Sequence, residues 1–444
     1  MTIAYESWGK LPQAEHVIQR LRWRTEDIKP EWIHGSILPF GLGRSYGDSC
    51  LNDGGTLLDT SSLNHFIRFD PQNGIFACEA GVTFADILKI VVPRGWFLPV
   101  TPGTKYVTVG GAVANDVHGK NHHRAGTFGC HVTRFELLRS DGKRLVCSKD
   151  ENHDWFRATI GGLGLTGLIL WAEFKLKKIQ GPFIDGEFLK FSNLEEFFEI
   201  SADSDESHEY TVGWLDCLSK GKNFGRGIFI RGSHSDNQSA HTRGKDQLLN
   251  IPFDLPDCLL NRFSIKLFNT FYFNKQPKKK VKKQVSYEPF FYPLDAIGHW
   301  NRIYGKRGFF QYQCVIPEET NHPAVKEILK LITESGRASF LTVLKNFGAI
   351  HSPGMLSFPR KGLTLAFDFP NQGVSSLKLF NELDKIVITH GGALYPAKDA
   401  RMSPESFQTF FPQWKEFSRF LDPKFSSSFW RRVTKRHGEE SKYA

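Results

Sequence analysis

Three glycine-rich segments near the start of the chain carry residue types that suit a phosphate-bearing ligand. They are residues 39–48 (PFGLGRSYGD), 102–111 (PGTKYVTVGG) and 161–167 (GGLGLTG). Glycine allows positive φ and close backbone approach, so such loops can turn successive backbone N–H groups toward an anion. One such loop is weak evidence, because glycine loops are usually turns. Three in one half of the chain indicate a large cofactor that carries phosphate and lies across that half.

Two of these segments also invite a nicotinamide interpretation. Gly162, Gly164 and Gly167 match G-x-G-x-x-G, and the first segment comes close to it. That fingerprint requires a strand before it, a helix after it and an acidic residue about 20 positions later. The later segment runs instead into the strand-like LILWA, and the earlier one into the turn cluster NDGG. We therefore expect no Rossmann site, and the sequence also lacks a P-loop motif.

A histidine-rich segment, HGKNHH at 118–123, raises the possibility of a metal site. His118 and His122 have the i, i+4 spacing of zinc ligands, and His123 and His131 lie close by. Glycine and asparagine between them disfavour a helix, and no acidic residue completes H-E-x-x-H. We expect no metal here, and we assign the segment to packing beside the cofactor and to anion binding.

The elements that must position these residues follow from local patterns. In the first half, residues 75–80 alternate as a strand does, and residues 83–92 have helical spacing that ends at a Pro and a Gly. Residues 135–138 and 145–148 flank Asp-Gly, which predicts a hairpin. Residues 168–176 read as a further strand.

The sequence pattern changes after about residue 183, where glycines become fewer and predicted strands alternate with predicted helices. The pattern predicts a helix over 324–334, a strand over 363–369 and a single helix over 404–420. We predict an α+β protein with three parts: a cofactor-binding domain over 1–182, a substrate domain with an antiparallel sheet flanked by helices over 183–400, and a C-terminal segment, 401–444, that packs back on the first domain.

An aromatic and apolar stretch, residues 259–273, runs directly into a lysine cluster. The lysines are Lys275, Lys278, Lys279, Lys280, Lys282 and Lys283. Apolar residues beside lysines suit the surface of a membrane that carries anionic lipid. The alternative is an ordinary core helix followed by a solvated basic loop. The sequence leaves both open.

Composition limits the class of protein to which the chain can belong. The 444 residues carry a formal net charge of +10, with 40% hydrophobic and 23% charged residues, which is typical of a globular chain. The first residues do not resemble a secretory signal, and no run of about 18 apolar residues predicts a membrane span. Seven scattered cysteines without a C-x-x-C pair favour a reducing compartment, so we expect a cytoplasmic protein.

The order of the motifs carries a resemblance. P-x-G-x-G-R-S-Y-G-D, then P-G-T, then T-V-G-G-A with D-x-H-G-K-N-H-H, then G-G-x-G-L-T-G resembles the FAD-binding (PCMH-type) domain of the vanillyl-alcohol-oxidase superfamily. More narrowly, this series of motifs is similar to that of the decaprenylphosphoryl-β-D-ribose 2′-oxidase family. That family catalyses the first half of an epimerisation that leads to the arabinose donor for cell walls. FQYQCVIP at 310–317, LSFP at 356–359 and YPAKDAR at 395–401 extend the similarity over nearly the whole chain.

The resemblance implies a set of cofactor-binding residues. In many relatives a histidine in the first motif bonds covalently to the flavin. Tyr46 stands there in this chain, so we expect FAD to be held non-covalently. The implied FAD contacts are Gly41, Leu42, Gly43, Arg44, Ser45, Tyr46, Gly47, Asp48, Gly103, Thr108, Val109, Gly110, Gly111, Asn115, His118, Ile169 and Tyr395.

The resemblance also implies oxidation of a ribose 2-hydroxyl to a ketone, which requires a base and cations near the developing alkoxide. Lys398 is the leading candidate base, and Tyr46, His118 and Lys345 are the other catalytic candidates. Lys120, Gln311, Gln313, Lys345 and Lys398 are the implied substrate contacts. Gln311 and Gln313, two apart, would share one face of a strand.

Two positions depart from the family pattern. A cysteine that benzothiazinone-type inhibitors trap covalently in the mycobacterial enzyme is replaced by Ala366, and Thr364 replaces an amide residue. Alanine is no nucleophile, so we expect no covalent labelling.

The implied partners are a lipid-linked sugar phosphate, a separate NADH-dependent keto-reductase and a peripheral membrane surface on the inner face, with no nucleic acid. Two other functions remain open: an aldonolactone or sugar-alcohol oxidase of the same superfamily, and a non-enzymatic basic scaffold that binds lipid.

Overall fold

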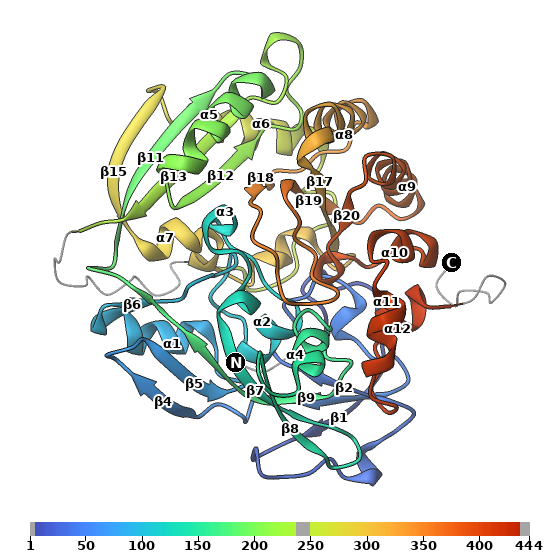
Figure 1. Cartoon of the computed structure of the whole chain (residues 1–444). Helices are drawn as coiled ribbons and strands as arrows, with labels where there is room; N and C mark the ends of the chain where they lie inside the picture. The colour runs from blue at the N-terminus through green and yellow to red at the C-terminus, as the bar shows by residue number, and fades with distance from the viewer. Residues whose placement is uncertain (1–4, 237–248, 436–444) are drawn as a thin grey trace.

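The computed structural model describes residues 5–236 and 249–435, and it is α+β, as the sequence predicts (Figure 1). The chain begins with a small parallel sheet in the order β1-β3-β2. Its strands are β1 (Val17–Arg20), β2 (Ile37–Phe40) and β3 (Thr56–Asp59). The first glycine loop leaves the end of β2, so this sheet fixes where that loop starts.

A five-stranded antiparallel sheet follows, in the order β4-β5-β9-β7-β8. The predicted hairpin is confirmed, because β7 and β8 pair antiparallel on either side of Asp141-Gly142. The predicted helix is confirmed as α1 (Phe84–Val91), whose N-cap Thr83 accepts a hydrogen bond from the Asp86 backbone. The strands are β4 (Phe66–Asp70), β5 (Ile75–Glu79), β7 (Val132–Leu138), β8 (Arg144–Ser148) and β9 (Leu168–Lys175).

Three short helices complete this half of the molecule. They are α2 (Val109–Ala114), α3 (His122–Ala125) and α4 (His153–Thr159). Helix α2 lies against β5 and β9, and Val109, Ala112 and Val113 bury their side chains in the core there. A separate antiparallel pair is formed by β6 (Trp96–Phe97) and β10 (Lys177–Lys178).

The second half is built on an eight-stranded antiparallel sheet in the order β15-β11-β13-β12-β18-β19-β17-β20. Its strands are β11 (Phe183–Phe191), β12 (Tyr210–Leu215), β13 (Gly227–His234), β15 (Lys280–Ser286), β17 (Phe309–Pro317), β18 (Thr342–Phe347), β19 (Gly362–Pro370) and β20 (Ala393–Leu394). A short parallel pair, β14 (Leu249–Asn250) with β16 (Ile297–Gly298), lies outside it.

Three helices cover one face of this large sheet: α5 (Leu194–Ser207), α8 (Asn321–Ser335) and α9 (Val374–Thr389). Side chains such as Phe197, Ile328 and Leu383 join Leu344 and Leu365 of the sheet in one buried cluster. The opposite face is turned toward the first half of the chain, with α7 (Tyr287–Phe291) between them (Figure 1). The site described below lies on that opposite face.

The C-terminal segment corrects one prediction. The single helix expected over 404–420 is divided into α10 (Pro404–Phe410), α11 (Trp414–Phe417) and a 3-10 turn at Ser418–Phe420. Pro412 explains the break, because proline lacks the N–H and its ring clashes with the preceding turn. Helix α12 (Ser428–Val433) then packs against the turn at Asp48–Cys50.

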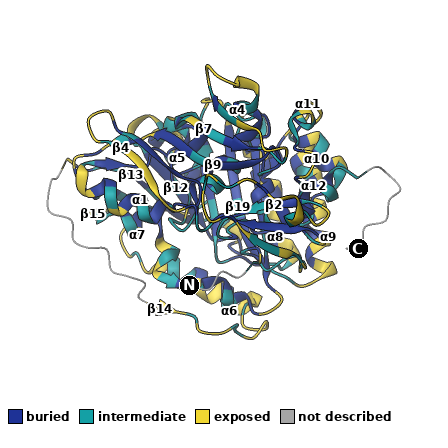
Figure 2. Ribbon diagram, turned by 90° about the horizontal axis from the view of Figure 1, so that it is seen from below, coloured by how far each residue is buried: buried dark blue, intermediate teal, exposed yellow. Residues whose placement is uncertain are grey.

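The aromatic-basic stretch also takes a form that the sequence left open. Residues 259–273 form most of α6 (Arg262–Asn274), and the lysines continue into the edge strand β15 rather than into a loop. Lys279 pairs with Glu196, and Lys280 and Lys282 pair with Glu187. Much of α6 is nevertheless exposed (Figure 2).

Candidate active site

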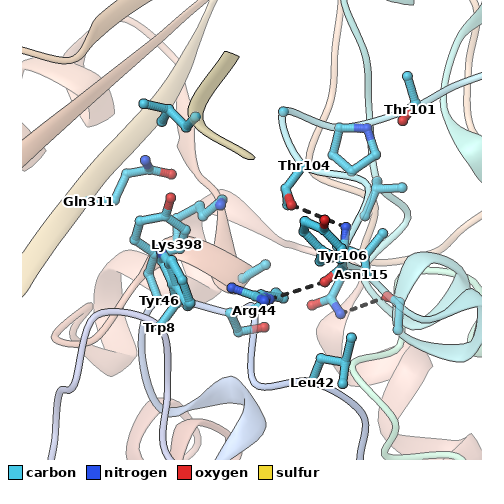
Figure 3. Close-up of a pocket in the computed structure, with 18 of the residues that line it drawn as sticks. Trp8, Leu42, Arg44, Tyr46, Thr101, Thr104, Tyr106, Asn115, Gln311 and Lys398 are labelled. Carbon is cyan, nitrogen blue, oxygen red and sulfur yellow. Dashed lines mark hydrogen bonds between the residues drawn. The ribbon is translucent and has the colours of Figure 1, made fainter. Parts of the chain in front are cut away.

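A cavity of about 940 Å³ lies between the two halves of the molecule and collects most of the residues that the sequence singled out. The loop after β2, the turn after β20 and the inner face of the large sheet all contribute to its wall. Figure 3 shows Lys398 beside Tyr46, with Gln311 above them and Arg44 below.

The first glycine loop offers free backbone donors to this cavity. Among the described residues, no hydrogen bond uses the backbone N–H of Leu42, Gly43, Arg44 or Ser45. Gly43 has φ +60°, and a Cβ there would lie 2.4 Å from the carbonyl oxygen of Glu6, so only glycine fits. Consecutive free N–H groups around a left-handed residue form an anion-binding nest. The loop therefore fits a pyrophosphate, as expected.

The second glycine segment works differently from the prediction. The N–H groups of Val109, Gly110 and Gly111 already donate within the protein, to Val82, Ala80 and the Thr108 hydroxyl. They are not available to hold a pyrophosphate. Gly110 is required for packing instead, because a Cβ there would lie 2.9 Å from the Cβ of Ala80.

Most of the expected cofactor residues line the cavity. They are Gly41, Leu42, Gly43, Arg44, Ser45, Tyr46, Gly103, Thr108, Gly110, Gly111, Asn115, His118, Ile169 and Tyr395. Gly47, Asp48 and Val109 do not line it. Asp48 is buried in an ion pair with Arg432, and Val109 lies in the core, so both have structural roles.

Arg44 brings a half-buried cation to the cofactor side of the cavity. Its Nε donates to the carbonyl of Tyr106 at 3.1 Å, and its guanidinium lies 4.1 Å from the centre of the Trp8 ring. Burial lowers the pKa of Arg44, but an arginine keeps its charge at any physiological pH. The side chain is thus held in place and still able to attract an anionic group.

Lys398 lies in the turn after β20, against Tyr46. Its Nζ is 3.7 Å from the centre of the Tyr46 ring. Burial lowers the pKa of Lys398, and the charge of Asp368 opposes that shift. Burial raises the pKa of the Tyr46 phenol well above its usual value. Tyr46 therefore stays protonated near neutral pH, which makes it a weaker candidate base than Lys398.

Asp368 is a residue that the sequence analysis did not single out. It follows Thr364 and Ala366 at spacings of two on β19, so all three share the inner face of the sheet. Its carboxylate accepts a 2.6 Å hydrogen bond from the Gln311 amide, and its second oxygen has no hydrogen-bond partner among the described residues. Burial raises the pKa of Asp368, because the one hydrogen bond from Gln311 does not replace full hydration of the carboxylate. Strand alternation was the signal that could have identified it.

His118 is fixed between Lys345 and Gln313. Its Nδ1 lies 2.8 Å from Lys345 Nζ, and its Nε2 lies 3.1 Å from the side-chain amide of Gln313. Burial and the neighbouring lysines hold the pKa of His118 well below its usual value. The structure places Gln313 Nε2 against His118 Nε2, so this amide donates to Nε2 while Nδ1–H donates to the neutral amine of Lys345. With the Gln313 amide rotated by 180°, Lys345 donates to Nδ1 and Nε2–H donates to the amide oxygen. His118 is therefore an orienting group rather than a base.

Three lysines meet in this cavity, and the Asp368 carboxyl acts on one of them, Lys398. Lys120, Lys345 and Lys398 all line it. Burial lowers the pKa of Lys120 to about 8, and burial with repulsion from Lys120 and Lys398 lowers that of Lys345 to about 7. Among the described residues, Lys120 Nζ donates only to a carbonyl, that of Phe291, at 3.0 Å. Such a cluster favours a ligand that brings negative charge.

Gln311 and Gln313 both line the cavity, so their predicted common face is confirmed. Gln311 lies opposite Asp368, and Gln313 lies opposite Ala366. Nearby, the Tyr395 hydroxyl donates to the carbonyl of Asn115 at 2.8 Å, and its ring stacks on Phe358. The inner sheet face thus presents two amides beside the lysines, where a sugar could be held.

The histidine segment does not gather into a cluster. His123 and His131 contact separate backbone carbonyls, those of His208 and Ala125. His122 accepts a hydrogen bond from the Gly348 backbone. Within residues 5–236 and 249–435, no group of three or more His, Cys, Asp or Glu side chains is placed to hold a metal ion.

Comparison with known proteins agrees with this geometry. Residues 30–148 match the FAD binding domain family. The chain is 37% identical over 415 residues to the decaprenylphosphoryl-β-D-ribose oxidase of Mycolicibacterium smegmatis, covering 89% of each chain. It is 31% identical to an uncharacterised protein of Streptomyces coelicolor, over 79% of this chain and 100% of that one. It is 30% identical to the human Δ24-sterol reductase over 26% of this chain and 22% of that one.

Proposed function

The chain belongs to the decaprenylphosphoryl-β-D-ribose oxidase family and is an FAD-dependent oxidoreductase, and we propose that it oxidises the 2-hydroxyl of a polyprenyl-phosphate-linked ribose to a 2-keto sugar. The observation that carries the proposal is the cluster of Lys120, Lys345 and Lys398 in the cavity that the glycine loop borders. A sugar joined to a phosphate supplies both negative charge for these three lysines and hydroxyls for Gln311 and Gln313.

The cofactor fits the residues present. The free N–H groups of Leu42–Ser45 would hold the pyrophosphate, and Asn115, Ile169 and Tyr395 would lie along the ring system. Bound FAD supplies the acceptor for the hydrogen and electron pair that leave C2 of the sugar.

Lys398 takes the proton of the 2-hydroxyl in this scheme. Its burial lowers its pKa, so a useful fraction is neutral near pH 7 and can act as a base. Asp368 lies close enough to act electrostatically on Lys398 and stabilises the ammonium that forms. Gln311, held by Asp368, keeps its amide in place beside the sugar.

His118, Lys345 and Gln313 form the opposite wall. The contacts among them fix the imidazole and the ammonium with respect to each other. Lys345 provides positive charge where alkoxide character develops, and a dry cavity makes that charge more effective than it would be in water. Lys120 binds the phosphate, since it is a half-buried cation whose Nζ, within the part of the chain that the structure describes, donates a hydrogen bond only to a carbonyl.

The product implies a second enzyme. A 2-keto sugar becomes the epimeric alcohol only when hydride is returned to it, so we propose a separate NADH-dependent keto-reductase as partner. Neither G-x-G-x-x-G-like segment of this chain has the strand–turn–helix context of a nicotinamide site: β9 follows the third glycine segment directly. We expect no nucleic acid partner.

We also propose that the enzyme works against the cytoplasmic face of the membrane. No described helix is long and apolar enough to cross a bilayer. The support for a surface position is α6, on which Phe263, Leu267 and Phe271 are 77%, 63% and 67% exposed. These residues are four apart and form one outward stripe, with Lys266, Lys275 and Lys278 exposed around it. An apolar stripe edged by lysines matches an anionic lipid surface.

The central test is anaerobic reduction of the bound flavin. Adding a prenylphosphoryl ribose to the holoenzyme should bleach the flavin absorbance and yield a product two hydrogens lighter. An aldonolactone or a sugar alcohol should leave the absorbance unchanged. Bleaching by a soluble lactone, with peroxide formed in air, would instead establish the aldonolactone-oxidase alternative.

The membrane position has its own test in liposome flotation. The native protein should float with vesicles that contain anionic lipid and not with neutral ones. Changing Leu267 to Glu should abolish flotation, whereas Ile388→Glu, on the exposed side of α9, should not. These point changes are preferable to deleting 275–283, because that deletion removes part of the edge strand β15. Equal flotation of Leu267→Glu would contradict the proposal.

A further inference from the structure

The inner face of the eight-stranded sheet carries polar side chains on one side and apolar side chains on the other. Residues directly opposite each other on neighbouring strands point to the same face. The register therefore traces two rows across the inner face: Gln313, Ala366, Val343 and Trp214 in one, and Val212, Ile230 and Phe188 in the other. All of them line the cavity.

The rows are polar near the cofactor and apolar away from it. On β17 to β18 the inner side chains include Gln311, Gln313 and Lys345, whereas on β12, β13 and β11 they are Val212, Trp214, Ile230 and Phe188. The opposite orientation is excluded for β12, because a Cβ on its neighbour Gly213 would point at Phe197 of α5 on the far face. The cavity thus continues beyond the lysines as an apolar space.

Two helices form the other wall of this space. Tyr272 of α6 packs on Trp214 with ring centres 4.6 Å apart, and Phe290 and Phe291 of α7 also line the cavity. Val212, Ile230 and Phe188 remain only partly buried, so the described side chains leave space over them. Lys283 borders this space, with its Nζ 4.5 Å from the centre of the Phe188 ring. We call the space bounded by Phe188, Val212, Trp214, Ile230, Tyr272 and Val285 the apolar arm.

Lys120 stands where the polar part of the cavity meets the apolar arm. Its Nζ bonds the carbonyl of Phe291 on α7, and its own carbonyl accepts from the backbone of Thr211, next to Val212. A phosphate held by Lys120 would have the sugar on one side and the apolar arm on the other. The order of groups in the cavity is then the order of groups in a prenyl-phosphate sugar.

We propose that the apolar arm binds the first isoprene units of the substrate's lipid chain and so makes the enzyme selective for chain length. The proposal rests on the proposed function and adds a specificity site to it. Burying each added isoprene unit against Val212, Ile230 and Phe188 favours binding until the arm is full. The same helix, α6, covers the arm with Tyr272 and exposes its apolar stripe outward, so the lipid site and the membrane-facing surface adjoin.

The test compares two substrates in detergent, with the ribosyl phosphate carrying one isoprene unit or three. For the native holoenzyme, kcat/KM should be at least about tenfold higher with the longer chain, mainly through KM. Val212→Phe puts a ring into the arm and should bring that ratio near one. Val374→Phe is the matched control, because Val374 is 69% exposed on α9, and it should keep the native ratio.

Flavin content and thermal unfolding check that Val212→Phe is folded, and Ile230→Phe is the second variant if it is not. A native ratio near one, or a native ratio retained in the folded variants, would overturn the proposal. Failure of the proposed function looks different: the native enzyme would oxidise neither substrate. In that case farnesyl phosphate is the probe, and calorimetric binding to the native protein but not to Val212→Phe would still support the arm, whereas equal or absent binding would refute it.

Discussion

The ammonium of Lys398 lies 3.7 Å from the centre of the Tyr46 ring, so the turn after β20 meets the first glycine loop inside the cavity. The backbone N–H of Tyr46 also donates to the carbonyl of Ala397 at 2.9 Å. These two contacts join the segment that carries the candidate base to the loop that carries the free N–H groups. The fold itself therefore fixes the position of the candidate base with respect to the first glycine loop.

Replacing Lys398 tests its role as the base. Lys398→Met should slow flavin reduction by about 10²–10⁴-fold, the usual contribution of general base catalysis, without loss of bound flavin. In the native enzyme the rate should rise with pH through neutrality, because the neutral amine is the active form and burial lowers the pKa of Lys398. Anaerobic stopped-flow from about pH 6 to about pH 9 measures the rate of flavin reduction in Lys398→Met and the pH dependence of that rate in the native enzyme. A native pH profile in Lys398→Met would assign the base elsewhere.

Binding of the phosphate should weaken as pH rises. The pKa of Lys345 is lowered to about 7 and that of Lys120 to about 8, so both ammonium groups lose their protons between neutral and mildly alkaline pH. A bound anion favours the charged lysines, and binding should therefore take up protons. Calorimetry of a ribosyl phosphodiester in buffers of different ionisation enthalpy measures this uptake. Lys120→Met should bind more weakly at low pH and lose the alkaline part of the dependence; an unchanged profile would remove Lys120 from the phosphate site.

The flavin should be held without a covalent bond. Tyr46 occupies the position where many relatives of the superfamily carry the linking histidine, and its buried phenol has a raised pKa and packs against Phe309. Acid precipitation of the purified yellow protein should leave the flavin absorbance in the supernatant. Colour that stays in the pellet would show a covalent link and would overturn this interpretation of Tyr46.

Benzothiazinone-type inhibitors should not form a covalent adduct with this protein. Ala366 lines the cavity opposite Gln313 and Val343, where no thiol is available. Cys50 also lines the cavity, but burial raises the pKa of its thiol to about 12, so it is a poor nucleophile. Intact mass after turnover with the inhibitor should match the native protein. Ala366→Cys should gain the adduct, and an adduct on the native protein would contradict the argument.

Arg432 should be critical for stability although it lies outside the cavity. It pairs with Asp48 at 2.6 Å and with Asp399 at 2.9 Å, which ties α12 to the first glycine loop and to the turn that carries Lys398. Arg432→Met leaves two buried carboxylates unpaired, a change that typically costs about 3–5 kcal/mol. Denaturant unfolding with saturating FAD measures the loss. The exposed Lys415→Met should unfold like the native protein, and a similar result for Arg432→Met would show that the pairs are dispensable.

Local sequence was enough for the elements whose signals are local. Thr83 and the periodic apolar residues after it defined α1, Asp141-Gly142 defined the β7–β8 hairpin, and the glycine loops indicated a phosphate-bearing cofactor. The helix predicted over 404–420 failed for an equally local reason: Pro412 breaks it. The sequence did not predict that the lysines of β15 lie in a strand, because an exposed edge strand and a solvated loop have similar compositions.

Only the tertiary structure decided which chemical groups meet. His118 and Lys345 are 227 residues apart in sequence and 2.8 Å apart in the cavity, because the register of β18 and the packing of the two halves bring them together. Asp368 gained its importance in the same way, through its place beside Gln311 on the inner face of the sheet. The sequence by itself determined the cofactor class and, through its resemblance, the family, and 14 of the 17 expected cofactor contacts line the cavity. The pKa shifts, the orientation of His118 and the polar-to-apolar gradient depend on burial and strand register, which exist only in the folded chain.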